Sequence, residues 1–257
     1  MEIKYKFIGQ VILLAVLFSL EWLLPYFANS HHKFRHAARN LTLAFINGLV
    51  GTLVFSSLII SSINYSSAKG YGILNSFELA NLRIVLALVL FDLWMYLWHR
   101  MNHRVKFLWK FHRMHHSDSE MDVTTGLRFH PGEIILSFCA RLIIIPLIGI
   151  NFSELIVYEV LLQFIVLFHH SNISINKSID KVFKLVFVSP HMHKVHHSDI
   201  QTETDSNYSS VFSVWDRVFG SLNNREDTEN ISFGLKEFNK DSDQEVVGML
   251  KTPFKSP

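Results

Sequence analysis

Histidines are concentrated in one region of this chain and recur there at helical spacing. Of the 15 histidines in 257 residues, 12 lie between positions 99 and 197. Neutral imidazole nitrogen is a strong ligand for iron, copper, zinc and nickel. Residues three or four apart share one face of a helix, and two groups repeat an H-x-x-H-H spacing. This pattern predicts a metal centre rather than a set of basic histidines at a membrane surface. The three groups are His99 and His103; His112, His115 and His116; and His193, His196 and His197.

The number of imidazoles predicts more than one metal ion. A structural zinc site needs only four ligands in a closed shell. With His169 and His170 emerging beside the three groups, the chain offers nitrogen for two metals with about four or five ligands each. Imidazole alone leaves iron, copper, nickel and zinc open. The expected position, at the mouth of a membrane helix bundle, favours an iron oxygenase over a zinc hydrolase, because unactivated C–H bonds of lipids require a redox metal and dioxygen.

Long apolar runs predict the elements that position these histidines. A run of ~20 apolar residues spans the hydrocarbon of a bilayer. We expect three transmembrane helices, followed by two 17-residue runs that form a short helical hairpin, either fully spanning or re-entrant. The expected spans are 7–27, 41–63 and 79–98, and the hairpin comprises 134–150 and 152–168. The predicted fold is therefore an all-α integral membrane protein with a His-rich helical cap.

Positive charge predicts the orientation of the cap. The 31–39 segment and the 99–113 segment are both rich in Lys and Arg, and two expected spans separate them. Loops rich in Lys and Arg face the cytoplasm, so we expect the histidine site on that side. His32 and His36 lie in the first segment at H-x-x-x-H spacing, and either face lipid headgroups or touch metal.

Other polar side chains lie where they could supplement or orient the histidines. Asp92 precedes His99 by seven residues on the same helical face, so we expect its carboxylate to accept from a histidine N–H, with Arg83 or headgroups as alternative partners. His130 either contacts the metal centre or caps the start of the hairpin. Three carboxylates could be ligands or partners of ligands: Asp118, Glu120 and Glu133. For Asp118 and Glu120 the alternative is a solvent-exposed loop. His191 is a further possible partner of a ligand.

Composition excludes several other classes of protein. The net charge of +2 is too small to indicate nucleic-acid binding. The single cysteine, Cys139, excludes an intrachain disulfide, a cysteine-rich zinc module and a four-cysteine iron–sulfur site. The mean hydropathy of +0.22 agrees with a membrane protein.

The ordered motifs resemble those of the fatty acid hydroxylase and sterol desaturase superfamily over roughly residues 80–222. The resemblance implies a helical membrane fold and a histidine-ligated centre of two iron ions. It assigns the three histidine groups as ligands, with one more at His169 or His170, and does not demand a histidine at His191. The motifs are D-x3-Y-x2-H-R-x2-H from Asp92, H-R-x-H-H from His112, R-x-H-P-x-E from Arg128, H-S-N-I from His170, S-P-x-x-H-x-x-H-H-S from Ser189, and N-Y…W-D-R-x-F-G from Asn207 to Gly220.

The resemblance also implies a reaction and a division of the chain. The reaction is dioxygen-dependent hydroxylation or desaturation of a fatty acyl or sterol-like lipid, with electrons from an external cytochrome b5-like or ferredoxin-like donor. The alternatives are a metal-dependent membrane lipid hydrolase and a metal transport or sensing protein. We expect N-terminal transmembrane helices over 1–78, a catalytic domain over 79–222 and a polar tail over 223–257. The box of Trp215, Asp216 and Arg217 is expected to pack the cap against the site.

Overall fold

The computed structural model describes residues 2–28 and 30–255. Within these ranges the regular structure is helical, and the only β pairing consists of three isolated bridges. The all-α prediction is therefore confirmed. The long elements are α1 (Glu2–Leu23), α2 (Lys33–Val50), the π-helical turn η1 (Gly51–Phe55), α3 (Ser56–Lys69), α4 (Ala80–Arg104), α6 (Pro131–Ile148) and α7 (Phe152–His170).

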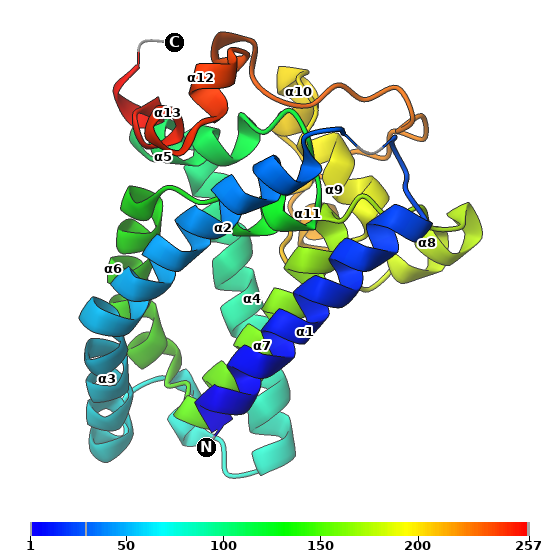
Figure 1. Ribbon diagram of the computed structural model, residues 1–257. Coiled ribbons are helices and arrows are strands. Elements are labelled where there is room, and N and C mark those ends of the chain that lie inside the picture. Colours follow the sequence, from blue (N-terminus) through cyan, green and yellow to red (C-terminus); the bar gives the residue numbers. More distant parts are fainter. Residues whose placement is uncertain (1, 29, 256–257) are drawn as a thin grey trace.

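Within residues 2–28 and 30–255, four helical stretches are long and apolar enough to cross a membrane. They are the 44-residue stretch Lys33–Ser76 and the helices α4, α6 and α7. The first expected span, 7–27, is not among them. The apolar part of α1, Phe7–Leu23, is shorter than each of these four stretches. Figure 1 shows α2 and α3 meeting at an angle, and the π-helical turn η1 lies at this bend, as is usual for a sharp helix kink.

Most of the short helices gather at one end of the bundle and form the cap, whereas η2 (Ile73–Ser76) lies at the opposite end, near Arg83. In Figure 1, α3, α4, α6 and α7 occupy the lower half, whereas α5, α9, α10, α12 and α13 lie at the upper end. The short elements are η2 (Ile73–Ser76), α5 (Lys106–His116), η3 (Val123–Leu127), α8 (Lys177–Phe183), α9 (Pro190–His196), α10 (Gln201–Thr204), α11 (Val214–Val218), η4 (Lys236–Phe238), α12 (Asp241–Gln244), α13 (Val246–Leu250) and η5 (Thr252–Phe254).

Local sequence signals start and stop the helices that carry the histidines. Val105 is extended, with φ −95° and ψ 110°, so α4 ends there and α5 packs back against it. Asn151 and Glu154 form a capping box at the start of α7. The hydroxyl of Ser189 caps α9 ahead of Pro190 at its first position. These boundaries direct the histidine-bearing ends of α4, α5, α7 and α9 into the cap.

The core holds the bundle together beneath the cap. Phe91 of α4 and Tyr158 of α7 are fully buried and make an edge-to-face contact with ring centroids 4.9 Å apart. Near the opposite end, Arg83 forms an ion pair with Glu154 at 2.7 Å. A charge pair within a helix bundle avoids the cost of an isolated charge in hydrocarbon.

The C-terminal segment, which was expected as a polar tail, folds onto the cap. Ile231, Phe238 and Met249 are at most 7% exposed. Met249 of α13 packs in one cluster with Leu43 of α2 and Met114 of α5. A segment with few apolar residues can still be ordered when each of these residues is buried. A search for helical periodicity does not detect such a segment.

Candidate metal centre

Two groups of histidines converge at the end of the bundle next to the cap. Within each group the nearest ring nitrogens lie within 4.8 Å of one another. Seven of these nine side chains are at most 2% exposed, and the ring of His103 is fully enclosed. The first cluster comprises His99, His103, His112, His116 and His196, and the second cluster comprises His115, His170, His193 and His197.

The two clusters divide the sequence motifs between them. The H-x-x-H-H motif of α5 gives His112 and His116 to the first cluster and His115 to the second. On α9 the corresponding motif gives His196 to the first cluster but His193 and His197 to the second. Adjacent side chains of a helix point in different directions, so one short helix lies between two sites and supplies both.

Burial favours the neutral form of several imidazoles in the two clusters. Burial, reinforced by the neighbouring imidazole His197, holds the pKa of His116 well below its usual 6.5. The pKa values of His115 and His193 are lowered in the same way, first by burial and then by adjacent imidazoles. Only neutral imidazole has a lone pair for a metal, so the enclosed site favours the form that binds metal.

Main-chain carbonyls fix which nitrogen of several rings carries the proton. His99 Nδ1 donates to the carbonyl of Tyr208 at 2.8 Å, and His196 Nδ1 donates to that of Ser206 at 2.6 Å. His115 and His170 of the second cluster do the same toward the carbonyls of residues 128 and 166, at 3.2 and 2.8 Å. A carbonyl oxygen only accepts, so Nε2 of each of these rings carries a lone pair.

These lone pairs face one another. His99 Nε2 lies 3.0 Å from His196 Nε2, and His115 Nε2 lies 3.2 Å from His170 Nε2. Two such nitrogens of neutral rings cannot share a hydrogen bond, so their close approach favours a cation between them. A metal bound at ~2.1 Å to each holds two nitrogens about 3 Å apart when the bonds meet near a right angle. Among the residues that the structure describes, neither ring nitrogen of His103 or of His116 has a hydrogen-bond partner. The residues therefore fit two metal ions.

A carboxylate orients one ring of the first cluster. His112 Nδ1 donates to Glu133 Oε1 at 2.8 Å, and both side chains are buried. This arrangement leaves His112 Nε2 for the metal and increases its basicity. Of the two expected roles for Glu133, ligand or partner of a ligand, its contact with His112 favours the second.

One expected partner of the centre, Asp92, has other contacts. Asp92 accepts hydrogen bonds from Tyr158, Trp215 and the Phe212 N–H, at 2.7, 2.8 and 3.0 Å. Its predicted bond to a histidine is therefore wrong. The donors to Asp92 come from segments that pack against α4, not from the face of α4 that carries His99. Helical periodicity does not show which segments pack against a helix.

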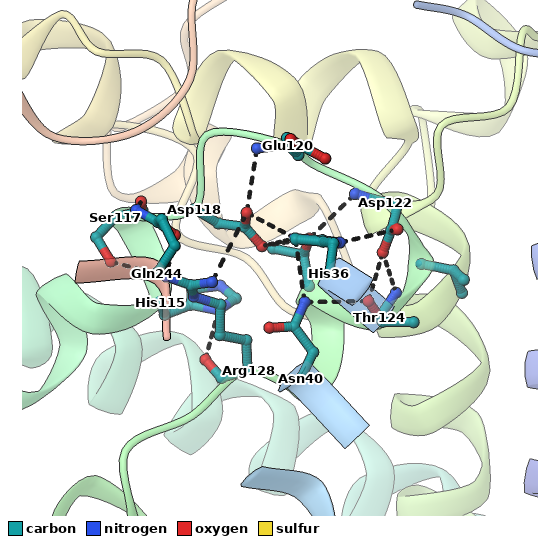
Figure 2. A network of polar contacts seen from close by, with 12 residues as sticks. His36, Asn40, His115, Ser117, Asp118, Glu120, Asp122, Thr124, Arg128 and Gln244 are labelled. Atoms are coloured by element: carbon teal, nitrogen blue, oxygen red, sulfur yellow. Dashed lines mark hydrogen bonds and ion pairs between the residues drawn. The ribbon is translucent and has the colours of Figure 1, made fainter. Parts of the chain in front are cut away.

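The remaining histidines lie outside the two clusters. His130 caps α6, since its Nδ1 accepts from the Gly132 N–H at 2.9 Å. His191 Nδ1 lies 2.8 Å from Asp180. The ring of His169 contacts that of His193 at a tilt of 32°, with centroids 3.8 Å apart, whereas the adjacent His170 lies in the second cluster. His36 lies between Asp118 and Asp122 (Figure 2). It belongs to neither cluster and is buried, so it neither touches the metal centre nor faces lipid headgroups, the two roles that were expected.

Several hydrogen-bonding groups around the centre were not predicted from the sequence. The accepting carbonyls of Tyr208, Ser206 and Arg128 are main-chain atoms, so side-chain identity does not indicate them. Asp122 was also missed, although its capping box with Thr125 is a recognisable local pattern.

A cavity of about 350 Å³ reaches both clusters. Imidazoles of the first cluster, including His99, and of the second, including His170, form part of its wall. Apolar side chains such as Met95, Phe138 and Leu162 form most of the rest. A cavity of this size with apolar walls and a few polar groups is suited to an apolar ligand.

These features define a helical membrane protein in which two buried histidine clusters can bind metal ions at the end of an apolar cavity. The sequence profile of the fatty acid hydroxylase family matches residues 84–221, more than half of the chain, and the protein belongs to this family. The expected resemblance is confirmed. The match leaves α1–α3 and the C-terminal part of the cap outside the family region.

Several curated relatives share this region. Ornithine lipid hydroxylase OlsE of Rhizobium tropici is 28% identical over 153 residues, which are 60% of this chain and 45% of OlsE. Human alkylglycerol monooxygenase is 30% identical over 147 residues, 56% of this chain and 31% of the relative. Human cholesterol 25-hydroxylase is 24% identical over 140 residues, 54% and 50% of the two chains. The chain thus spans half or less of the length of these relatives. No solved structure matches it.

Proposed function

We propose that the protein is a membrane-bound non-haem di-iron oxidoreductase that hydroxylates or desaturates a lipid. The observation that carries this proposal is the apolar cavity that ends on imidazoles of both clusters. It would place an aliphatic chain against two adjacent metal ions. A transport site would instead lie on a polar path near the membrane midplane.

The proposed ligands follow the two clusters. The five imidazoles of the first cluster would hold one iron and the four of the second cluster the other. We propose His170, rather than His169, as the ligand at the end of α7, because only His170 lies within the second cluster. When bound, the iron pair would supply the dioxygen-dependent oxidation that an unactivated C–H bond requires.

The protein's own residues would prepare this reaction. The apolar walls of the cavity would bind the lipid chain and exclude water. Carbonyls of Tyr208 and Ser206 would hold His99 and His196 with Nε2 directed inward. Glu133 would orient His112. Rings held in this way lose little freedom when they bind metal, which favours a site formed in advance.

The relatives and the charge pattern support the finer points. The names of the three relatives favour hydroxylation of a lipid over desaturation. Electrons would come from an external cytochrome b5-like or ferredoxin-like donor. The 31–39 and 99–113 segments, rich in Lys and Arg, adjoin the cap, so we propose that the active site faces the cytoplasm.

The test uses the full chain in detergent with ferrous iron, a reductant, dioxygen and a lipid extract. We expect dioxygen consumption coupled to a lipid product that has gained one oxygen atom, as in hydroxylation, or lost two hydrogen atoms, as in desaturation. His115→Ala and His196→Ala should each abolish this product while still inserting in the membrane, because each removes a ligand from one cluster. His31→Ala, at an exposed position, is the matched control.

Two outcomes would contradict the proposal. Activity that persists in both His115→Ala and His196→Ala would refute their roles as ligands. A lipid product that forms without dioxygen would instead identify a hydrolase.

A further inference from the structure

One buried histidine outside both clusters is held by carboxylates on both sides. His36 of α2 lies 2.8 Å from Asp118 Oδ1 through Nε2 and 3.0 Å from Asp122 Oδ2 through Nδ1 (Figure 2). It is 6% exposed, and the two carboxylates are at most 5% exposed. Both ring nitrogens thus face acceptors, so His36 offers no lone pair to a metal.

The two carboxylates close the loop that follows α5. Asp122 accepts from the N–H and the hydroxyl of Thr124, at 2.7 and 2.6 Å, and so starts η3. Asp118 accepts from the hydroxyl of Thr125 at 2.8 Å. The loop is therefore folded on itself around the ring of His36, and α2 supplies that ring from outside the family region.

The same loop reaches the second cluster through Arg128. The guanidinium of Arg128 is fully buried, lies 3.9 Å from Asp118 and donates to the Met114 carbonyl at 3.1 Å. The carbonyl of Arg128 accepts from His115 Nδ1. A continuous chain of contacts thus runs from His36 through Asp118 and Arg128 to His115, as Figure 2 shows.

We propose that His36 is a positioning residue for the second cluster, acting through Asp118 and Arg128 on the ring of His115. The proposal rests on the proposed function, in that the second cluster must hold iron. Without the ring of His36, two buried carboxylates lose their shared partner, and an uncompensated buried charge rearranges or draws in water. The loop would then no longer hold the Arg128 carbonyl against His115.

The location of the contacts predicts a selective effect. The first cluster receives its orienting hydrogen bonds from Tyr208, Ser206 and Glu133, which do not contact His36. Loss of His36 should therefore weaken the second iron and leave the first in place. A purely structural role in α2 would instead destabilise both sites together.

The experiment measures iron bound per full-length chain, titrated with ferrous iron in detergent, together with the spectrum of the bound iron. We expect two irons for the wild type with the signature of an exchange-coupled pair. His36→Leu should bind about one iron with the signature of an isolated ion. His32→Leu, four residues earlier on an exposed position, should retain two.

His36→Gln keeps the test decisive if His36→Leu does not fold. Its neutral amide carries both N–H donors on one nitrogen and cannot reach carboxylates on opposite sides of the ring, so we expect weaker binding of the second iron and unchanged binding of the first. Two irons at wild-type affinity in either variant would overturn the proposal, as would equal loss of both irons. A wild-type chain that binds no iron would instead refute the proposed function, on which this inference depends.

Discussion

The hydrogen bond on one nitrogen of an imidazole decides whether the other can bind a metal. In the first cluster, His99 and His196 donate to main-chain carbonyls, whereas His112 donates to a carboxylate, Glu133. The carboxylate differs because its charge increases the basicity of the ring and stabilises it next to a cation. Glu133 lies at the start of α6, so this helix is coupled to the centre through one side chain.

Replacement of Glu133 should therefore weaken the first cluster. We expect Glu133→Gln, which keeps the size of the side chain but removes its charge, to lower the affinity for iron by about 10–100-fold. A titration of the metal-free chain with ferrous iron measures this change. Glu78→Gln, at an exposed position, should bind like the wild type. Equal affinities for Glu133→Gln and the control would contradict a role for Glu133 in orienting His112.

At this scale the sequence predicted the converging histidines better than their hydrogen-bond partners. Spacing alone located the histidines that converge, because positions three or four apart share a helix face. The same reasoning failed for Asp92, whose partners Tyr158 and Trp215 lie 66 and 123 residues further along the chain. Periodicity shows which face a residue is on but does not show which distant element packs against that face.

At the scale of elements, two buried aspartates hold the cap segment 206–215 in place. Asp216 accepts from the N–H groups of Tyr208 and Ser209, at 2.8 and 3.0 Å. Asp92 of α4 holds the same segment through Phe212 and Trp215. This segment carries the carbonyls that orient His99 and His196. The Trp215–Arg217 box thus joins the cap to the bundle.

Loss of Asp92 should loosen this segment. Asp92→Leu leaves the hydroxyl of Tyr158, the indole of Trp215 and the N–H of Phe212 without their acceptor. We expect a loss of about 2–3 kcal/mol in the free energy of unfolding, the cost of a few buried donors with no partner. Thermal unfolding and limited proteolysis between residues 205 and 222 measure the effect. Asp241→Leu, at an exposed position, is the control, and equal stability of both variants would contradict this role.

The elements were predictable where composition determines them. Lengths of apolar sequence located α4, α6, α7 and the stretch shared by α2 and α3, because hydrocarbon thickness sets the length of a span. The bend at Gly51–Phe55, inside the expected span 41–63, was not predicted. The C-terminal part of the cap was not predictable in this way. Its order depends on a few apolar residues, such as Met249, that become buried only when α2 and α5 are in place.

Across the whole molecule, parts outside the family region complete the enclosure of the centre. α2 contributes His36, and Gln244 of α12 accepts from the Arg128 guanidinium at 2.8 Å. Such enclosure has a cost in the metal-free chain, because lone pairs are buried together without a cation. The imidazoles must remain neutral in the folded state but can take up protons freely in the unfolded state.

This difference predicts how the stability of the metal-free protein depends on pH. The pKa values of His116 and His197 are held well below 6.5 by burial and by neighbouring imidazoles. Below pH 6.5 the unfolded chain therefore binds protons that the folded chain does not. Each such imidazole should lower the free energy of unfolding by about 1.4 kcal/mol per pH unit, as the pH falls from 6.5 toward the folded pKa.

Carboxylates should contribute little in this window. Burial acts to raise the pKa of Asp118, but His36 and Arg128 outweigh it and hold this pKa well below its usual 3.8. The stabilisation that the Asp118 carboxylate provides is therefore lost only at more acidic pH. Thermal unfolding of the metal-free chain in detergent between pH 7.5 and 5 measures the imidazole effect. We expect a constant midpoint above pH 7 and a steep fall below 6.5. A constant midpoint across the whole range would mean that water reaches the rings in both states, and that the nine imidazoles do not form an enclosed centre before metal binds.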